Sequence, residues 1–181
     1  MQILTKKIEA YNFNELSDQA KDEFRFLENT NWWTNPISEE FKNTLNIFCN
    51  EFDINWHEYD VSPPQINYSM GITNLKLKNY DPKYDEDILY KLTSKKVSED
   101  CPLTGVYCDE LILKPIRKLE FTKKFCDSFY QNFDIEQLWD DCINNWLKGL
   151  QAEYDYHLSD DGLNELCKAN EYLFTKDGKL I

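Results

Sequence analysis

Apolar residues recur at helical spacing through much of the chain, most regularly in its last third. Between residues 135 and 150 they fall three or four positions apart, the spacing that places them on one buried helix face. Asp134 and Gln137 have the spacing of a capping box, while Phe133 and Leu138 stand where a hydrophobic staple would close over the first turn. The pattern predicts a long helix that begins next to Asp134.

The same spacing, combined with capping residues, predicts further helices. Ser17 is placed to cap a helix that runs to about residue 28, and Ser38 to cap a second helix with acidic residues in its first turn. Pro115 suits the first position of a helix through about residue 131, which we expect to fold back antiparallel on the Asp134 helix. Ser159 precedes a short helix over residues 160–168, and residues 85–95 fit one more.

Elsewhere the period of the pattern changes towards two, which indicates strands. Residues 2–11 suit an N-terminal strand, residues 66–72 alternate, and a second alternating run follows Thr73 and Asn74. At the C-terminus, residues 176–178 suit a hairpin turn with Gly178 where positive φ is needed. We therefore expect an α+β fold: a small antiparallel sheet with a C-terminal hairpin, covered by about five helices including the antiparallel pair.

The length of 181 residues suits one domain with an ample core, and we expect a single α+β domain over 1–181. Within it, residues 1–80 would form a strand-helix-helix-sheet part and residues 81–181 a helical part with the hairpin. Near the N-terminus there are lysines but no apolar signal sequence, and no stretch approaches the length of a membrane span, so we expect a cytoplasmic protein. The six cysteines lack paired spacing and are expected to be free thiols.

The net charge of −13 is concentrated at the two ends of the chain. Residues 1–60 carry 5 basic and 12 acidic side chains, residues 61–125 carry 11 and 9, and residues 126–181 carry 4 and 12. Proteins that bind free nucleic acid usually neutralise phosphates with Lys and Arg, so the acidic ends argue against such binding. They favour a basic protein partner, although charge that only confers solubility gives the same pattern.

The densest group of ionisable side chains follows the long helix. Glu153, Asp155, His157, Asp160 and Asp161 lie within nine residues. A histidine with carboxylates has the donor types for acid–base chemistry or a metal site, but this spacing matches no mechanistic motif. Acidic residues in the first turn after a serine cap are also favoured by the helix dipole alone. We therefore expect no metal site and no cofactor.

Five short stretches stand near the two ends of the chain: Tyr-Asn-Phe-Asn-Glu-Leu-Ser-Asp-Gln-Ala-Lys at 11–21, Trp32-Trp33, Ser159-Asp-Asp, Ala169-Asn-Glu-Tyr and Phe174-Thr-Lys-Asp-Gly-Lys. Together they resemble a family of small phage and mobile-element proteins, often labelled as antitoxin of a toxin-antitoxin stability system. The resemblance covers roughly a third of the chain. After the second helix this family typically has an aromatic, glycine-rich run, which the chain replaces by residues 56–71 with Pro63 and Pro64.

The resemblance implies a phage accessory protein, and acidic phage accessory proteins of this size include anti-CRISPR inhibitors. We therefore expect a phage-encoded protein that inhibits a type II RNA-guided DNA nuclease, in its guide-loaded form, by binding it through an acidic surface. The expected partner-binding residues are Asp140, Asp141, Asp155, Asp160 and Asp161.

Two alternatives remain open. In the first, the chain is an enzyme that truncates or modifies guide RNA, with His157 and Asp155 as acid and base and the lysine-rich middle segment holding RNA. In the second, it is an antitoxin that neutralises a partner toxin. A shortened guide would indicate the enzyme, and an adjacent toxin gene the antitoxin.

Overall fold

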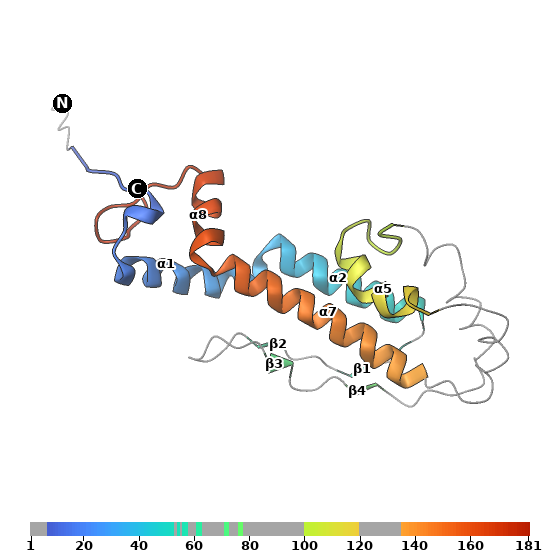
Figure 1. The fold of residues 1–181 in the computed structure, drawn as a ribbon. Helices are drawn as coiled ribbons and strands as arrows, with labels where there is room; N and C mark the ends of the chain where they lie inside the picture. Colours follow the sequence, from blue (N-terminus) through green and yellow to red (C-terminus); the bar gives the residue numbers. More distant parts are fainter. Residues whose placement is uncertain are drawn as a thin grey trace, which may run out of the picture. The chain divides into compact units, whose positions relative to one another are not determined.

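The computed structural model describes residues 7–52, 54, 56–57, 61–62, 71–72, 76–77, 100–119 and 135–181. Most of these residues lie in helices (Figure 1). They divide into two compact units. Unit 1 takes the residues up to Trp33 and those from Ala152 onward, and unit 2 takes Thr34–Gln151.

Unit 1 is built from helices whose starts are set by local capping. After the 3₁₀ turn η1 (Phe13–Glu15), helix α1 (Asp18–Asn31) begins where the Ser17 hydroxyl accepts the Ala20 N–H. Helix α8 (Asp160–Ala169) begins where the Ser159 hydroxyl accepts the Gly162 N–H at 3.0 Å. Both predicted serine caps are confirmed, because capping depends on residues within one helical turn.

The core of unit 1 joins these helices to the C-terminal segment. Phe13, Phe24 and Phe174 are all at most 3% exposed, and the rings of Phe24 and Phe174 meet edge to face with centroids 5.1 Å apart. Leu163 and Cys167 of α8 complete this core. Each such side chain contributes roughly 2 kcal/mol of transfer free energy, so the C-terminal segment is held to the unit mainly by Phe174.

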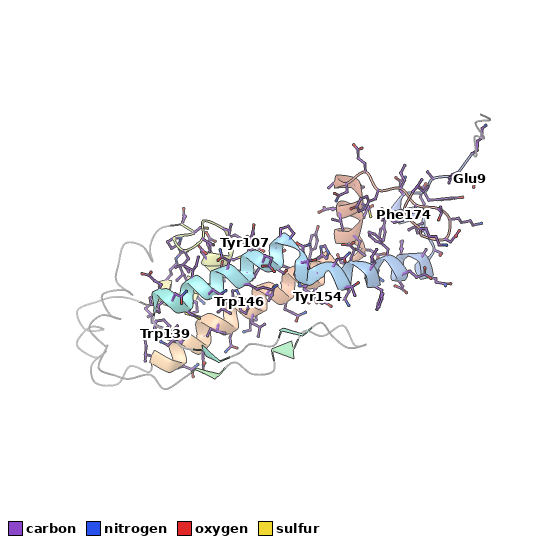
Figure 2. The ribbon with its side chains drawn as sticks, turned by 180° about the vertical axis from the view of Figure 1, so that it is seen from behind. Glu9, Tyr107, Trp139, Trp146, Tyr154 and Phe174 are labelled. Carbon is purple, nitrogen blue, oxygen red and sulfur yellow. The ribbon has the colours of Figure 1, made fainter. Side chains whose placement is uncertain are left out.

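Unit 2 packs α2 (Pro36–Glu51), α5 (Cys108–Arg117) and the first part of α7 (Ile135–His157). Trp139 and Trp146 lie on the buried face of α7 (Figure 2), and the Trp146 indole donates a hydrogen bond to the Phe41 carbonyl at 3.0 Å. The predicted apolar face of the long helix is confirmed, since Leu138 and Leu150 are also buried.

Helix α2 begins earlier than predicted, because Asn35 and not Ser38 is its N-cap. The Asn35 side chain accepts the Ile37 N–H at 2.9 Å, and Pro36 occupies the first turn with its φ already fixed near the helical value. Ser38 lies inside the helix, where its hydroxyl donates to the Asn35 carbonyl. The prediction was wrong because an Asn-Pro start competes successfully with a serine three residues later.

Pro115 was predicted to be the first residue of a helix, and this prediction is wrong. The residue lies inside α5. A proline within a helix cannot donate to the carbonyl four residues earlier, which here belongs to Leu111. That carbonyl accepts a hydrogen bond from the Asn145 side chain of α7. Gly149 permits the close approach, since a Cβ there would stand 2.4 Å from Leu111 Cδ1. The rest of the predicted Pro115 helix, and with it the antiparallel pair, lies outside the described residues.

Asp109 fixes the loop that precedes α5. Its side chain is fully buried and accepts the backbone N–H groups of Leu103 and Thr104, each at 2.7 Å, and that of Gly105 at 3.2 Å. The Thr104 hydroxyl donates to the same carboxylate at 2.6 Å, and the Thr44 hydroxyl of α2 adds a longer contact of 3.4 Å. The carboxylate thus replaces the water that these donors lose on burial.

The predicted α+β fold is wrong, because the described residues are mostly helical. Within the ranges that the structure describes, strands are limited to four two-residue segments: β1 (Trp56–His57), β2 (Val61–Ser62), β3 (Gly71–Ile72) and β4 (Lys76–Leu77). β1 pairs antiparallel with β4, with Trp56 opposite Leu77. β2 pairs antiparallel with β3, with Val61 opposite Ile72. β3 and β4 thus each pair with an earlier segment and not with each other, and the residues between them lie outside the described ranges.

Residues 7–11 of the predicted N-terminal strand and the predicted C-terminal hairpin do not belong to a sheet within the described ranges. Tyr11 and Leu180 each make only an isolated bridge to Phe174. Gly178 adopts the positive φ expected of the turn, at +79°, and a Cβ there would lie 2.8 Å from that of Ala20. The turn therefore packs on α1, and burial of Phe174 takes the place of sheet formation. The predicted helix at 85–95 and residues 2–6 lie outside the described residues.

Candidate functional site

The carboxylates predicted to bind a partner are divided between the two units. Asp140 and Asp141 are exposed on the part of α7 that belongs to unit 2. Asp155, Asp160 and Asp161 are exposed in unit 1. The five residues therefore do not form one cluster within a single unit, and the three in unit 1 have different surroundings.

Asp160 is neutralised by two cations from α1. Its carboxylate forms ion pairs with Lys21, at 3.5 Å, and with Arg25. Arg25 also pairs with Asp22 and donates from Nε to the Leu158 carbonyl at 2.9 Å. Asp160 thus helps to fasten the start of α8 to α1, and its charge is less available to a partner than that of Asp161.

A more suitable surface surrounds Tyr156, whose ring is 49% exposed at the end of α7. Its hydroxyl donates to Glu165 Oε2 of α8 at 2.7 Å. Glu153 stands three residues earlier on α7, one helical turn away, and Asp161 lies in the first turn of α8. We call Glu153, Tyr156, Asp161 and Glu165 the acid–tyrosine patch.

The pKa of Tyr156 reports the electrostatic field of this patch. It is raised above its ordinary value of 10.0, first by the hydrogen bond to Glu165, then by desolvation and by the charges of Glu165, Asp161 and Glu153. The three carboxylates therefore act on one exposed aromatic ring. Tyrosine is enriched among the residues that dominate protein–protein binding, and surrounding carboxylates favour a basic partner.

A tight turn between α7 and α8 holds the patch together. The Ser159 hydroxyl donates to the Tyr156 carbonyl at 2.7 Å while it accepts the Gly162 N–H. A Cβ at Gly162 would stand 2.1 Å from the Tyr156 carbonyl oxygen, so only glycine fits this position without a shift of the backbone. The turn thus brings Tyr156 and Glu165 together across nine positions of sequence.

His157 pairs with Glu28 of α1. Its Nε2 lies 3.5 Å from Glu28 Oε2, and the two side chains are 10% and 15% exposed. The imidazole packs on the ring of Trp32, with centroids 5.0 Å apart, and Trp32 also meets Tyr154 edge to face. The Tyr154 hydroxyl donates to the buried Asn29 side chain at 2.7 Å. This arrangement links α1 to the end of α7 within unit 1.

The surroundings of His157 differ from those expected of an acid–base pair with Asp155. Residues two apart on a helix face different directions, and accordingly Asp155 is exposed while His157 is largely buried. Within the described ranges, no group of three His, Cys, Asp or Glu side chains is arranged to hold a metal ion.

Three buried thiols, those of Cys49, Cys142 and Cys167, have raised pKa values. Burial raises the pKa of Cys49 to about 12 and, together with the charge of Glu28, raises that of Cys167 to about 11. Burial likewise raises the pKa of Cys142. A thiolate is the reactive form of cysteine, so at neutral pH these side chains act as small apolar groups.

Comparisons with protein-family models, with curated proteins and with solved structures give no match. None of the helices in the described ranges combines the length and the apolarity that a membrane span requires.

Sequence reasoning placed Glu153 in the ionisable group after the long helix but did not identify Glu28, Tyr156 or Glu165 as site residues. The helical spacing of Glu153 and Tyr156, and of Asp161 and Glu165, is visible in the sequence and would have indicated two shared faces. The contact of Tyr156 with Glu165 depends on the turn between the helices, and that of His157 with Glu28 depends on the tertiary fold.

Proposed function

We propose that this chain inhibits a basic, nucleic-acid-handling protein by occupying its positively charged surface through the acid–tyrosine patch. The observation that carries the proposal is the exposed ring of Tyr156, whose raised pKa records three nearby carboxylates. Such a surface supplies a rigid aromatic contact and negative charge to one partner.

The partner we propose is a guide-loaded type II CRISPR nuclease, which makes the chain a phage-encoded anti-CRISPR protein. Two observations support this choice: the resemblance at both ends of the sequence, and the −13 net charge, which suits a groove that normally binds nucleic acid. The protein would enter this groove in place of target DNA, with electrostatic steering speeding the encounter at low salt.

The five carboxylates expected from the sequence have unequal parts in this proposal. Asp161 belongs to the patch and has the largest part, and Asp155 is exposed on the same terminal turns of α7. Asp160 serves mainly to position α8, because Lys21 and Arg25 neutralise it. Asp140 and Asp141 add long-range attraction from unit 2.

The test is a cleavage assay with a purified, guide-loaded type II nuclease at two salt concentrations, with target DNA and guide RNA resolved on one denaturing gel. We expect the wild-type chain to prevent DNA cleavage, more strongly at low salt, with the guide intact. The double variant Asp161→Lys, Glu165→Lys should raise the concentration needed for half-inhibition by about tenfold or more.

The matched control is Asp140→Lys, Asp141→Lys, which makes the same change of charge in unit 2. We expect a smaller loss of inhibition, removed by high salt. Full inhibition by both double variants would contradict an acidic binding surface. A shortened guide would instead indicate an RNase, and stoichiometric capture of a toxin without nuclease inhibition would indicate an antitoxin.

A further inference from the structure

Unit 1 contains a cavity of about 620 Å³, and none of the residues that line it belongs to the acid–tyrosine patch. It lies between η1, the second half of α8 and the segment that follows α8. Its volume falls in the range of ordinary ligand sites, about 300–1,000 Å³. The cavity therefore has room for a short peptide segment.

The walls of the cavity combine an aromatic surface with amide groups. Phe13, Tyr172 and Leu173 supply the apolar part. Three asparagine side chains, from Asn12, Asn14 and Asn164, line the rest. Each amide has both donor and acceptor atoms, so such a wall can pair with the N–H and C=O groups of a peptide backbone.

The charged groups of the lining favour a cation. Glu15 and Glu171 contribute two carboxylates and Lys168 one ammonium, which leaves a net charge of −1. Glu15 is held in place because its Oε2 accepts the Asn12 backbone N–H at 2.7 Å and the Asn12 side chain at 3.0 Å. The lining thus offers two carboxylates, Glu15 and Glu171, together with Tyr172, and a guanidinium can pair with a carboxylate and stack on an aromatic ring.

The backbone of Glu171 gives independent support. Its backbone φ is +55°, a left-handed conformation that residues other than glycine rarely adopt. The Tyr172 N–H bonds the Cys167 carbonyl and the Glu171 N–H bonds that of Lys168, which is the Schellman pattern that ends a helix with glycine at this position. The chain thus keeps a glutamate at a strained position that lines a cavity, and local strain of this kind collects at binding sites.

We propose that this cavity binds an arginine-containing peptide segment, with the guanidinium between Glu171 and Tyr172. The identity of the segment rests on the proposed function: it would be an exposed arginine segment of the basic partner. The cavity would then provide the specific anchor, while the acid–tyrosine patch provides attraction over a longer range.

The test titrates the full-length, ¹⁵N-labelled chain with a five-residue peptide that contains two arginines, and with its citrulline counterpart, which has the same shape without charge. We expect the arginine peptide to shift the amide signals of residues 12–15 and 164–173 and to bind roughly tenfold more tightly than the citrulline peptide. Equal binding of the two peptides, or shifts confined to other residues, would overturn the proposal.

Two substitutions at Glu171 separate binding from folding. Glu171→Gln keeps the strained backbone and should weaken arginine-peptide binding roughly tenfold, whereas Glu23→Gln, an equal charge change on α1 outside the lining, should leave it unchanged. Glu171→Gly should weaken binding equally and raise the midpoint of thermal unfolding by about 2–4 °C, because it relieves the strain. Unchanged affinity in Glu171→Gln would overturn the proposal, as would tighter binding of an aspartate peptide that depends on Lys168.

The outcomes for the cavity and for the proposed function are distinguishable. Peptide binding that depends on Glu171, in a chain that inhibits no nuclease, would support the cavity and reject the inhibitor. Nuclease inhibition that requires Asp161 and Glu165 but is unaffected by Glu171→Gln, in a chain that binds no arginine peptide, would support the inhibitor and reject the cavity.

Discussion

The two units use their carboxylates in opposite ways. In unit 2 the Asp109 carboxylate is fully buried and organises the loop before α5 through backbone N–H groups. In unit 1 the carboxylates of Asp161 and Glu165 are exposed beside Tyr156. A buried charge that satisfies several donors stabilises one local structure, whereas an exposed one costs little and remains available to a partner.

The distribution of exposed apolar side chains follows the same division. Of the large apolar side chains exposed in the described ranges, only Tyr107 belongs to unit 2, where its ring meets that of Phe41. Unit 1 is therefore the part of the described chain with the composition of a binding surface. The exposed large apolar side chains of unit 1 are those of Ile8, Phe26, Leu27, Tyr156, Leu173, Leu180 and Ile181.

The largest effect is expected from Asp109→Ala in unit 2. The substitution leaves the partly buried N–H groups of Leu103 and Thr104 without this acceptor, so the free energy of unfolding should fall by about 3 kcal/mol. Urea denaturation followed by circular dichroism measures it. Asp161→Ala is the control in unit 1 and should change stability by at most about 0.5 kcal/mol. Similar losses in both variants would refute the contrast between the units.

A second comparison uses glycines, one from each unit. Gly162→Ala in unit 1 places a Cβ against the Tyr156 carbonyl oxygen and should cost about 3 kcal/mol of unfolding free energy. Gly105→Ala in unit 2 has a φ of +85° but open space around the added Cβ, so only the backbone strain remains, about 1 kcal/mol. Thermal unfolding of both variants tests the order, and a costlier Gly105→Ala would contradict it.

The smallest effect concerns the origin of two raised pKa values. The pKa of Tyr156 in unit 1 is raised chiefly by its hydrogen bond to Glu165, whereas the pKa of Cys49 in unit 2 is raised by burial. The raised pKa of Tyr156 therefore contributes to the stability of the fold at pH values below 10.0, the ordinary pKa of tyrosine. This contribution is lost as the pH rises through the higher pKa that Tyr156 has in the folded state.

Titration of the tyrosine ζ-carbon by NMR measures this shift. Glu165→Gln should move the pKa of Tyr156 back towards its ordinary value, and high salt should do so in part. The Cys49 thiol should respond to neither change, because burial is not screened by salt. A Tyr156 titration that is indifferent to Glu165→Gln would show that the patch does not act on this ring.

The parts of the fold that the sequence predicted correctly depend on nearby residues. The caps at Ser17 and Ser159 and the apolar face of α7 are set within one or two helical turns. The sheet was predicted from period-two alternation, but a strand also needs a partner at a distance in sequence. Near the C-terminus, burial of Phe174 against Phe24 replaces that pairing.

The candidate site was predictable only in part, for a related reason. Asp161 was identified from its sequence neighbourhood and does lie in the acid–tyrosine patch. Asp155 and His157 are neighbours in sequence, yet the helix turns them to different sides. The partner that His157 does have, Glu28, comes from the other end of the chain. Proximity along the sequence indicated the composition of the site but not its pairing.

The division of the chain has a consequence for synthesis on the ribosome. Unit 2 is one continuous stretch, whereas unit 1 needs residues from both sides of it, as in the Tyr11–Phe174 bridge. At the usual pace of translation, α1 emerges roughly 10 s before the residues of α8 that it packs with. During that interval Phe24 has no native partner from α8 or the C-terminal segment, so we expect the apolar face of α1 to stay exposed until the end of synthesis.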